Sequence, residues 1–266
     1  MLEWIRNRHR RELTEAPFPD AWQNYLESNV RLYALLSGPE QAALRDDLHI
    51  FLAEKNWEGC GGQAMTEEIK VTISAHACLL TLGLEHDYYP NLESILVYPS
   101  GYVARSRSIK AGGIVEEGPS GRLGEAWPNG PIVLSWSDAL RDGQGHNPGH
   151  NVILHEFAHK LDMVSGGADG VPRLHSDEDF DRWAVVMSEQ YQHLLHRIEH
   201  HEHPVIDPYG ATNPAEFFAV STEMFFEHPV VMQTHLPAMY DVLKAFYRQD
   251  PAARASKEDI RAGMQD

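Results

Sequence analysis

The sequence predicts a helix-rich α+β fold. Apolar residues recur at helical spacing through most of the 266 residues, and two short β-rich runs interrupt them, at residues 95–98 and 132–136. The chain shows no internal repeat and no low-complexity tract. With 42% hydrophobic residues it is long enough to bury a sizeable core, as one large domain or two small ones.

The first half of the chain contains the predicted N-terminal helices and the first strand. Residues 1–20 are charged and end in Pro17-Phe18-Pro19, so we expect a mobile arm there. The pattern at residues 21–56 predicts two or three helices, and the segment opened by Thr66-Glu67-Glu68 predicts another. The glycine-rich segment 99–130 predicts loop or an irregular hairpin.

The second half alternates helices with polar connections. After the strand at residues 132–136, a helix is predicted to start near Asn151, and the next runs from about Asp177 into the His-rich segment 196–203. Asn213-Pro214 announces a further helix, because Asn is a favoured N-cap and Pro a favoured first helical residue. The last predicted helix lies around residues 236–247.

Charge and cysteine content exclude several classes of protein. The balance of 22 basic and 39 acidic residues gives 22 − 39 = −17, which argues against a direct nucleic-acid or anionic-membrane binder. The longest apolar run, residues 77–84, is far too short to span a bilayer, and the charged N-terminus does not fit a signal peptide. We expect Cys60 and Cys78 to be reduced cysteines. We therefore expect a cytoplasmic protein with no membrane partner.

The strongest chemical signal is the motif His155-Glu156-Phe157-Ala158-His159, which matches H-E-x-x-H within an apolar helix. Two histidines four residues apart lie on one helix face, so both imidazoles can reach one metal ion. Glu156 would then lie beside the ion and act as the general base for a water molecule. This pattern predicts a catalytic metal site.

A third ligand must come from elsewhere, because catalytic zinc takes three protein ligands. The pattern H-E-x-x-H-x-x-G-x-x-H fails, since Leu161-Asp162 and Val164-Ser165 occupy the last specified positions. Asp162 shares the helix face of the histidines. It is interpreted as a residue that orients an imidazole, as a third ligand, or as a structural residue, and the residues alone leave these alternatives open.

A distal pair of glutamates offers the other candidates. Glu216 and Glu223 are seven residues apart, which places both on one face of the apolar helix that follows Asn213. A buried carboxylate needs a partner, and a metal would provide one. Glu216 is alternatively a capping residue that reaches back to Asn213. From the residues alone, Glu216 is favoured only slightly over Glu223 as a metal ligand.

Several longer motifs together resemble one known family. HEFAHKLD, followed about sixty residues later by DPYGATNPAEFFAVSTEMFF, with ILVYP and GPIVLSW upstream and YRQDP downstream, resembles the Mlc titration factor A family of bacterial zinc metallopeptidases. The matches span roughly residues 92–251. The resemblance implies a zincin-like metallopeptidase of gluzincin type with a small mixed sheet, aminopeptidase-like activity and a catalytic core similar to that of anthrax lethal factor.

The same resemblance implies roles for individual residues. The zinc histidines of the family fall on His155 and His159, its general base on Glu156 and its third ligand on Glu216, with one zinc ion per chain. Its active-site tyrosine falls on Tyr209. A phenol there could donate a hydrogen bond to the oxyanion of a tetrahedral intermediate, although without the resemblance a packing tyrosine is the stronger interpretation. Asp162 and Glu223 remain candidates for supporting the ligands.

Other chemistry-bearing segments carry weaker signals. His196, His200, His201 and His203 form a cluster on a charged segment that is more typical of a solvated surface. His146 and His150 precede the metal helix, but no spacing supports ligation by them. The strand at residues 132–136 is interpreted equally as a sheet edge that binds an extended substrate and as an ordinary core strand.

Two functions follow from these expectations. The first is a zinc-dependent peptidase that acts on a peptide substrate. The second is a regulatory binding protein with structural or vestigial zinc, because founding members of the family bind and sequester Mlc, a repressor of glucose-uptake genes. We predict an arm at residues 1–20, a single domain at 21–250 with a helical part (21–90) and a catalytic core (91–250), and a tail at 251–266.

Overall fold

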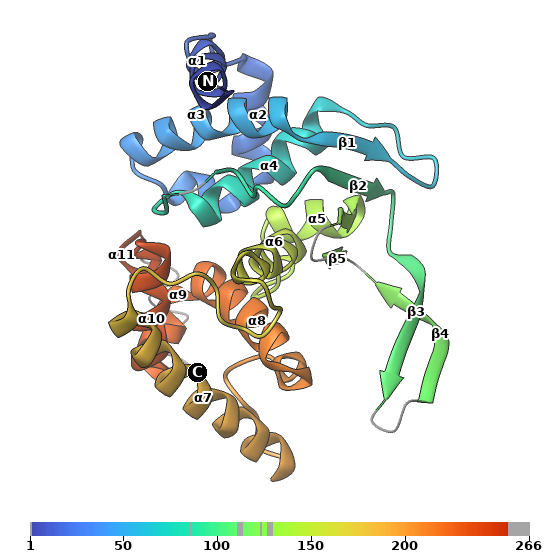
Figure 1. Ribbon diagram of the computed structural model, residues 1–266, viewed down its shortest axis with the longest axis vertical. Helices are drawn as coiled ribbons and strands as arrows, with labels where there is room; N and C mark the ends of the chain where they lie inside the picture. The colour runs from blue at the N-terminus through green and yellow to red at the C-terminus, as the bar shows by residue number, and fades with distance from the viewer. Residues whose placement is uncertain (1, 86, 111–113, 123, 127–129, 255–266) are drawn as a thin grey trace.

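Helices dominate the computed structural model, which describes residues 2–85, 87–110, 114–122, 124–126 and 130–254 (Figure 1). The predicted helix-rich α+β class is confirmed. The elements of the first half are α1 (Leu2–Thr14), α2 (Asp20–Asn29), the 3-10 helix η1 (Arg31–Leu35), α3 (Gly38–Glu54), β1 (Asn56–Gly59), α4 (Glu67–Thr81), β2 (Ser94–Tyr98), β3 (Tyr102–Lys110), β4 (Ile114–Arg122) and β5 (Gly124–Ala126).

The second half contains one further strand, helices, and two more 3-10 helices. These elements are β6 (Ile132–Ser135), α5 (Trp136–Gly143), α6 (Val152–Asp162), η2 (Met163–Ser165), α7 (Asp177–Glu199), η3 (Pro208–Thr212), α8 (Pro214–Glu227), α9 (Pro229–His235), α10 (Pro237–Tyr247) and α11 (Pro251–Arg254). The helix predicted to begin at Asn213-Pro214 is α8, and the one predicted around residues 236–247 is α10. In the part of the chain that the structure describes, no helix is both long and apolar enough to cross a bilayer.

The main sheet is small and mixed. Its strand order is β1-β2-β6-β5, in which β1, β2 and β6 run parallel and β5 runs antiparallel to β6. All four residues of β6 are buried, as expected for a strand between two neighbours. The interpretation of residues 132–136 as a substrate-binding edge is therefore wrong, because β2 and β5 occupy both sides of β6. This strand is part of the core.

In the sequence, a long β-hairpin lies between β2 and β5, which are both strands of the main sheet. Strands β3 and β4 pair antiparallel over nine residues each, from Tyr102↔Arg122 to Lys110↔Ile114. Figure 1 shows the hairpin extending away from the helices, beyond the sheet. The sequence predicted loop or an irregular hairpin here. The pairing is regular instead, although residues 111–113, 123 and 127–129 lie outside the described residues.

The N-terminal residues differ from the mobile arm that the sequence predicts. Leu2–Thr14 forms α1, and Arg10 joins this helix to the body through Glu54 at 2.6 Å and Asp87 at 2.7 Å. The guanidinium also lies 4.6 Å from the centre of the Tyr88 ring. These partners are 44 or more residues away in sequence, so the local charge pattern does not reveal them. At the other end, the predicted tail begins with α11, and residues 255–266 lie outside the described residues.

One hydrophobic core joins the N-terminal helices to the rest of the chain. Phe157, on α6, is fully buried and its ring centre lies 5.9 Å from that of Phe51 and 5.0 Å from that of Tyr89. Phe51 belongs to α3, so α6 packs its apolar face against the N-terminal layer, which consists of the helices α1 to α4 with η1. Figure 1 shows α6 between that layer and the C-terminal helices. The opposite face of α6 carries the histidines of the motif.

The core also contains a histidine, which makes stability depend on pH. His76 of α4 is fully buried, and its Nδ1 lies 2.9 Å from the Thr72 carbonyl oxygen. Burial lowers the pKa of His76 from 6.5 to about 4. The unfolded chain therefore binds more protons between these values, and stability that is present above pH 6.5 is lost as the pH falls towards 4.

We expect His76→Leu to flatten this dependence. The wild-type free energy of unfolding should lose about 2 kcal/mol from this residue between pH 7 and pH 5, and the variant should lack that loss. Denaturant unfolding at several pH values measures it. His203→Gln, which removes an exposed histidine, serves as the control and should keep the wild-type slope. An unchanged slope in His76→Leu would contradict the assignment.

Candidate metal centre

Helix α6 is fixed at its N-terminus by two polar side chains. The side chain of Asn151, the N-cap, accepts a hydrogen bond from the Leu154 amide at 3.2 Å. The buried carboxylate of Asp142 accepts one from the Val152 amide at 3.1 Å. Together they satisfy two amides that would otherwise have no helical partner. The position of His155, one turn further along, follows from this anchoring.

Helix α8 brings a carboxylate to the same place. Asn213 is its N-cap and accepts a hydrogen bond from the Glu216 amide at 3.0 Å, while Pro214 occupies the first turn. The cap and the proline explain why the helix starts here. The Glu216 carboxylate turns towards α6, where its Oε2 lies 3.0 Å from Nε2 of His155. The structure therefore places it at the histidines, away from the capping position considered in the sequence.

Three side chains converge at this point. His155 Nε2 lies 3.2 Å from His159 Nε2, and Glu216 Oε2 lies 3.0 Å from the first nitrogen and 3.3 Å from the second. These side chains are 13%, 11% and 18% exposed, respectively, so each is held by the protein on most sides. In the described part of the chain, this is the group of three that is arranged to hold a metal ion.

The donor set fits a metal ion. Zinc bonds of about 2.0–2.2 Å in a tetrahedron hold the ligand atoms about 3.3–3.6 Å apart, close to the observed separations of 3.0–3.3 Å. His155 Nδ1 lies 2.8 Å from Glu223 Oε2, and a carboxylate can only accept, so Nδ1 donates. In a neutral ring Nε2 then carries a lone pair that faces the Glu216 carboxylate. Acceptors that face one another at this distance need a cation or a proton between them.

The pKa values of His155 and Glu216 reflect how close these side chains lie to one another. Burial alone would lower the pKa of His155, but hydrogen bonds to Glu216 and Glu223 raise it well above its ordinary value. Burial would raise the pKa of Glu216, yet the two histidines lower it strongly. The site therefore favours a positive charge beside a carboxylate, which is also the charge arrangement that a divalent cation requires.

Glu223 supports His155 from the other side of its ring. It lies two turns beyond Glu216 on α8 and is 4% exposed. One carboxylate oxygen accepts from His155 Nδ1 at 2.8 Å, and the other accepts from the Asn151 amide at 2.7 Å. A hydrogen bond of this kind fixes the tautomer and the orientation of a ligating imidazole. Glu216 and Glu223 thus contact opposite ring nitrogens.

Asp162 lies outside the converging group and holds a loop in place. Its side chain is fully buried, and Oδ2 accepts a hydrogen bond from the Gly170 amide at 2.9 Å. Burial raises the pKa of Asp162, while the backbone amides of Gly170 and Val171 and the nearby His159 oppose the rise. Asp162 therefore connects the end of α6 to the loop that passes the start of α8.

Gly170 is the point at which this loop contacts α8. Its φ is +79°, and a Cβ there would clash with the carbonyl oxygen of Pro214. Its own carbonyl accepts from Nε1 of the buried Trp183 at 3.1 Å. The backbone at residue 170 is thus held on several sides, directly against the first turn that carries Glu216.

We expect Gly170→Ala to lower stability by about 3 kcal/mol and to weaken metal binding, because the new Cβ must displace Pro214. Gly166 provides a matched control in the same loop: its φ is +102°, but no atom lies within 4 Å of the position of a Cβ. Gly166→Ala should cost about 1 kcal/mol and leave metal affinity unchanged. Denaturant unfolding and metal titration of both variants measure this. Equal effects would contradict a role for residue 170 in placing α8.

Tyr209 lies beside the converging group. Its ring centre is 6.0 Å from that of His155, and the residue is 53% exposed. It belongs to η3, whose N-cap Asp207 accepts a hydrogen bond from the Tyr209 amide at 2.7 Å. The other carboxylate oxygen of Asp207 lies 3.5 Å from Nε2 of His150, in the segment before α6. The segment that carries Tyr209 is thus linked to the segment that leads to the histidines.

Glu156 follows the first histidine and is 5% exposed. Its charge acts on His155 and on Lys160, for both of which it favours the protonated form. Burial lowers the pKa of Lys160 to about 8, and its Nζ donates to the Gly130 carbonyl oxygen at 2.8 Å. Because Gly130 lies two residues before β6, Lys160 connects α6 to the sheet.

The other histidines do not form a comparable group among the described residues. His196 and His200 stack with ring centres 4.0 Å apart and an interplanar angle of 21°, and His200 Nδ1 lies 2.8 Å from the His196 carbonyl oxygen. Lone pairs in nearly parallel ring planes do not converge on one ion. Both residues are exposed, in agreement with a solvated surface.

Four residues fix the site through contacts that the sequence does not reveal. Asp142, Asn151, Glu227 and Arg31 are joined to α6 or to each other by hydrogen bonds or ion pairs. Asn151 carries a signal, because it is a good N-cap before an apolar run. Asp142 and Glu227 are ordinary helical acids in the sequence, and their partners lie up to 196 residues away. No local pattern identifies them.

A helix-rich fold with three converging side chains that could hold a metal ion is the arrangement expected of a metallopeptidase. A sequence model of the family described as glucose-regulated metallo-peptidase M90 matches residues 4–248. An uncharacterized protein of Synechocystis sp., slr2042, is 40% identical over 251 residues, which cover 94% of this chain and 90% of the relative. Mlc titration factor A of Yersinia pestis (strain Pestoides F) is 31% identical over 264 residues, 97% of this chain and 93% of the relative. The protein of that name from Yersinia pseudotuberculosis (serotype O:3, strain YPIII) gives the same values.

The chain belongs to the M90 family of metallopeptidases, which includes Mlc titration factor A. The resemblance inferred from the sequence motifs is confirmed. Membership supports a hydrolase that uses a metal ion and acts on peptides.

Proposed function

We propose that the protein is a zinc-dependent peptidase in which His155, His159 and Glu216 hold one zinc ion. The observation that carries this proposal is the convergence of two imidazole nitrogens and one carboxylate oxygen within 3.0–3.3 Å of one another. This is a usual ligand set for catalytic zinc, which keeps its fourth position open. When bound, the ion supplies a Lewis acid that polarises a carbonyl and lowers the pKa of a neighbouring water molecule.

The remaining chemistry is assigned to side chains of this chain. Glu156 takes a proton from the attacking water and returns it to the leaving amine, as general base and then general acid. Tyr209 donates a hydrogen bond to the oxygen on which negative charge develops, which its place beside His155 supports. Glu223 holds His155 in the required tautomer. Asp162 acts indirectly, because its carboxylate holds the loop at Gly170 in place.

The finer assignment is an aminopeptidase of gluzincin type with a catalytic core similar to that of anthrax lethal factor. The H-E-x-x-H motif with a distal glutamate on a second helix supports the gluzincin type. We propose one domain at residues 21–250, because a single hydrophobic core runs from α2 to α10. We also propose a cytoplasmic location. Cys60 and Cys78 are both free, which suits a reducing compartment.

Hydrolysis by the metal-free and zinc-reloaded protein tests the proposal. The panel should contain aminoacyl substrates, short peptides with a free N-terminus, and the same peptides with the N-terminus blocked. We expect cleavage of unblocked substrates, its loss after chelation, and its return with about one equivalent of zinc per chain. Activity that survives complete chelation would rule out the zinc mechanism. Equal cleavage of blocked peptides would rule out an aminopeptidase but leave a zinc peptidase.

A second candidate function is sequestration of a transcriptional repressor of the Mlc type. The name of the relatives that are 31% identical over 97% of the chain supports it. Binding alone requires no general base, whereas this chain retains Glu156 in a buried position beside the histidines. Capture of a repressor from the native cell by wild type and by Glu156→Gln tests the alternative. Equal capture would establish binding as a separate function, and no capture by either would reject it.

A further inference from the structure

The last residue of α8, Glu227, is a buried acid far from the converging ligands. It is 6% exposed and lies eleven residues after Glu216, about three helical turns away. Its carboxylate accepts a hydrogen bond from the Asn151 side-chain amide at 2.9 Å and from the guanidinium of Arg31 at 2.6 Å. Burial raises the pKa of Glu227, and Arg31 and Asn151 oppose the rise. These two contacts therefore stabilise a charge that would otherwise be costly to bury.

Arg31 comes from the N-terminal layer, in η1. Its side chain is 33% exposed and lies against the loop before α6, where a Cβ on Gly145 would clash with the aliphatic stem of the arginine. Gly145 has a φ of +77°, so the backbone there also favours glycine. The same guanidinium nitrogen lies 3.4 Å from the Glu227 carbonyl oxygen. Arg31 thus joins η1, to which it belongs, to the loop before α6 and to the end of α8.

Asn151 connects this ion pair to the metal helix. Its side-chain oxygen caps α6 through the Leu154 amide, its side-chain nitrogen donates to Glu227, and its backbone amide donates to Glu223. Each of these three groups is therefore used, and the residue is fully buried. A shift of Glu227 would move the cap of α6.

The contacts form one continuous series. It runs from Arg31 to Glu227 at 2.6 Å, from Glu227 to Asn151 at 2.9 Å, from Asn151 to Glu223 at 2.7 Å, and from Glu223 to His155 at 2.8 Å. Each acceptor is a carboxylate, and hydrogen bonds to charged groups are shorter and stronger than neutral ones. The series thus extends from the N-terminal layer to the Nδ1 atom of the first histidine.

We infer that Arg31 and Glu227 are positioning residues for His155, which act through Asn151 and Glu223 to set the affinity for the metal ion. The inference rests on the proposed zinc site. It means that the N-terminal layer completes the metal centre, although it supplies no ligand. Outer partners of ligating histidines typically change metal affinity 10- to 100-fold. We expect about tenfold here, because two residues lie between Glu227 and His155 and three between Arg31 and His155.

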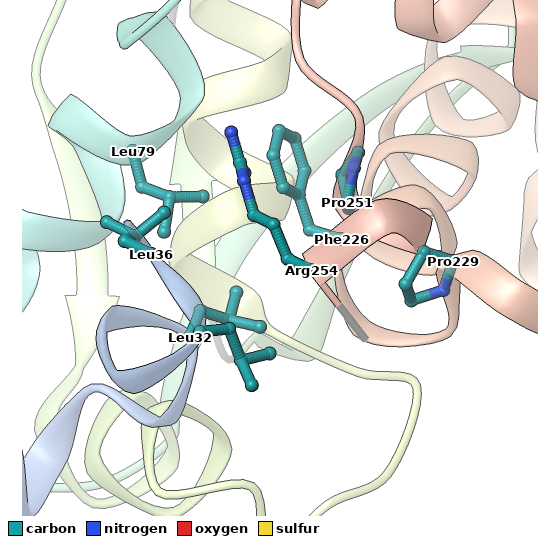
Figure 2. A pocket seen from close by; sticks show the side chains of 8 residues that line it. Leu32, Leu36, Leu79, Phe226, Pro229, Pro251 and Arg254 are labelled. Carbon is teal, nitrogen blue, oxygen red and sulfur yellow. The ribbon is translucent and has the colours of Figure 1, made fainter. Parts of the chain in front are cut away.

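A second ion pair in the same molecule provides a matched control. Arg254 of α11 pairs with Glu40 of α3 at 2.5 Å, again joining the N-terminal and C-terminal parts of the chain. Figure 2 shows Arg254 among the side chains that line a pocket, together with Leu36, Leu79 and Phe226. Its other side-chain partner is Gln249, which donates to the Leu79 carbonyl oxygen. This pair has the same chemistry as Arg31–Glu227, but these contacts do not lead to α6.

The test compares zinc affinities by competition with a chromophoric chelator, at a temperature at which every variant is folded. Arg31→Met and Glu227→Gln should each bind zinc about tenfold more weakly, and the double variant should bind no more weakly than either single one, because the residues act in series. Arg254→Met should lower Tm but keep the wild-type zinc affinity. In the zinc-loaded protein, the NMR signal of the His155 Nδ1 proton should shift in Glu227→Gln and not in Arg254→Met.

Two outcomes would overturn the inference. One is wild-type zinc affinity in both Arg31→Met and Glu227→Gln, and the other is an equal loss of affinity in Arg254→Met, which would show a general effect of lowered stability. If Arg31→Met does not fold, the isosteric Glu227→Gln decides the question by the same criteria. A wild-type protein that takes up no zinc would instead reject the proposed function, and this inference with it.

Discussion

Glu156→Gln should bind zinc as tightly as the wild type and hydrolyse peptides roughly 10²- to 10⁴-fold more slowly, which is the usual contribution of a general base. Glutamine has the same shape as glutamate but cannot accept the proton of the attacking water. Glu156 is buried beside the histidines and is not one of the three converging ligands, so its replacement should spare the metal. The loss should appear in kcat with little change in KM.

Steady-state kinetics with parallel measurement of zinc content checks this expectation. Glu189→Gln serves as the control, because Glu189 is exposed on α7 and the substitution makes the same change of charge. It should leave both kcat and zinc content at wild-type values. Full activity in zinc-loaded Glu156→Gln would reject the assignment of the general base. Loss of zinc together with activity would mean that Glu156 is needed to hold the ion.

Glu216→Ala should have the second large effect, on metal affinity. A structural zinc site with four ligands binds with about 10–16 kcal/mol, so one ligand accounts for about 3 kcal/mol, or more than 10²-fold in Kd. Glu223→Ala should weaken binding less, by about 10- to 100-fold, because Glu223 acts on the proposed site only through its hydrogen bond to His155. We therefore predict that Glu216→Ala lowers zinc affinity more than Glu223→Ala does.

Zinc titration of both variants against a competing chelator gives this order directly. Glu58→Ala, an exposed substitution on β1, is a suitable control and should leave Kd unchanged. A larger loss in Glu223→Ala than in Glu216→Ala would exchange the roles of the two glutamates. Equal wild-type affinity in both would place the third ligand elsewhere in the chain.

The sequence predicts those parts of the site that depend on local rules. The i, i+4 spacing of His155 and His159 and the Asn213-Pro214 helix start are local patterns, and the structure has α6 and α8 where they predict them. The choice between Glu216 and Glu223 is different, because residues two turns apart share a face. Only the packing of α8 against α6 shows that they contact opposite nitrogens of His155.

Other features depend on contacts between distant residues, which local patterns do not encode. Helix α1 is charged on its surface and is held by ion pairs to Glu54 and Asp87. Strand β1 is only four residues long and lacks β-branched residues, so its pairing with β2 determines its structure. The contact of Arg31 with Glu227 joins residues 196 positions apart. Each of these features is visible only in the folded chain.

The central claim is that His155, His159 and Glu216 together hold the catalytic zinc ion. Diffraction data collected on either side of the zinc absorption edge, from crystals of the zinc-loaded protein, test it most directly. We predict one strong anomalous peak per chain, between the Nε2 atoms of the two histidines and the Glu216 carboxylate. A peak at another place, such as the His196–His200 pair, with none at these three side chains would contradict the claim.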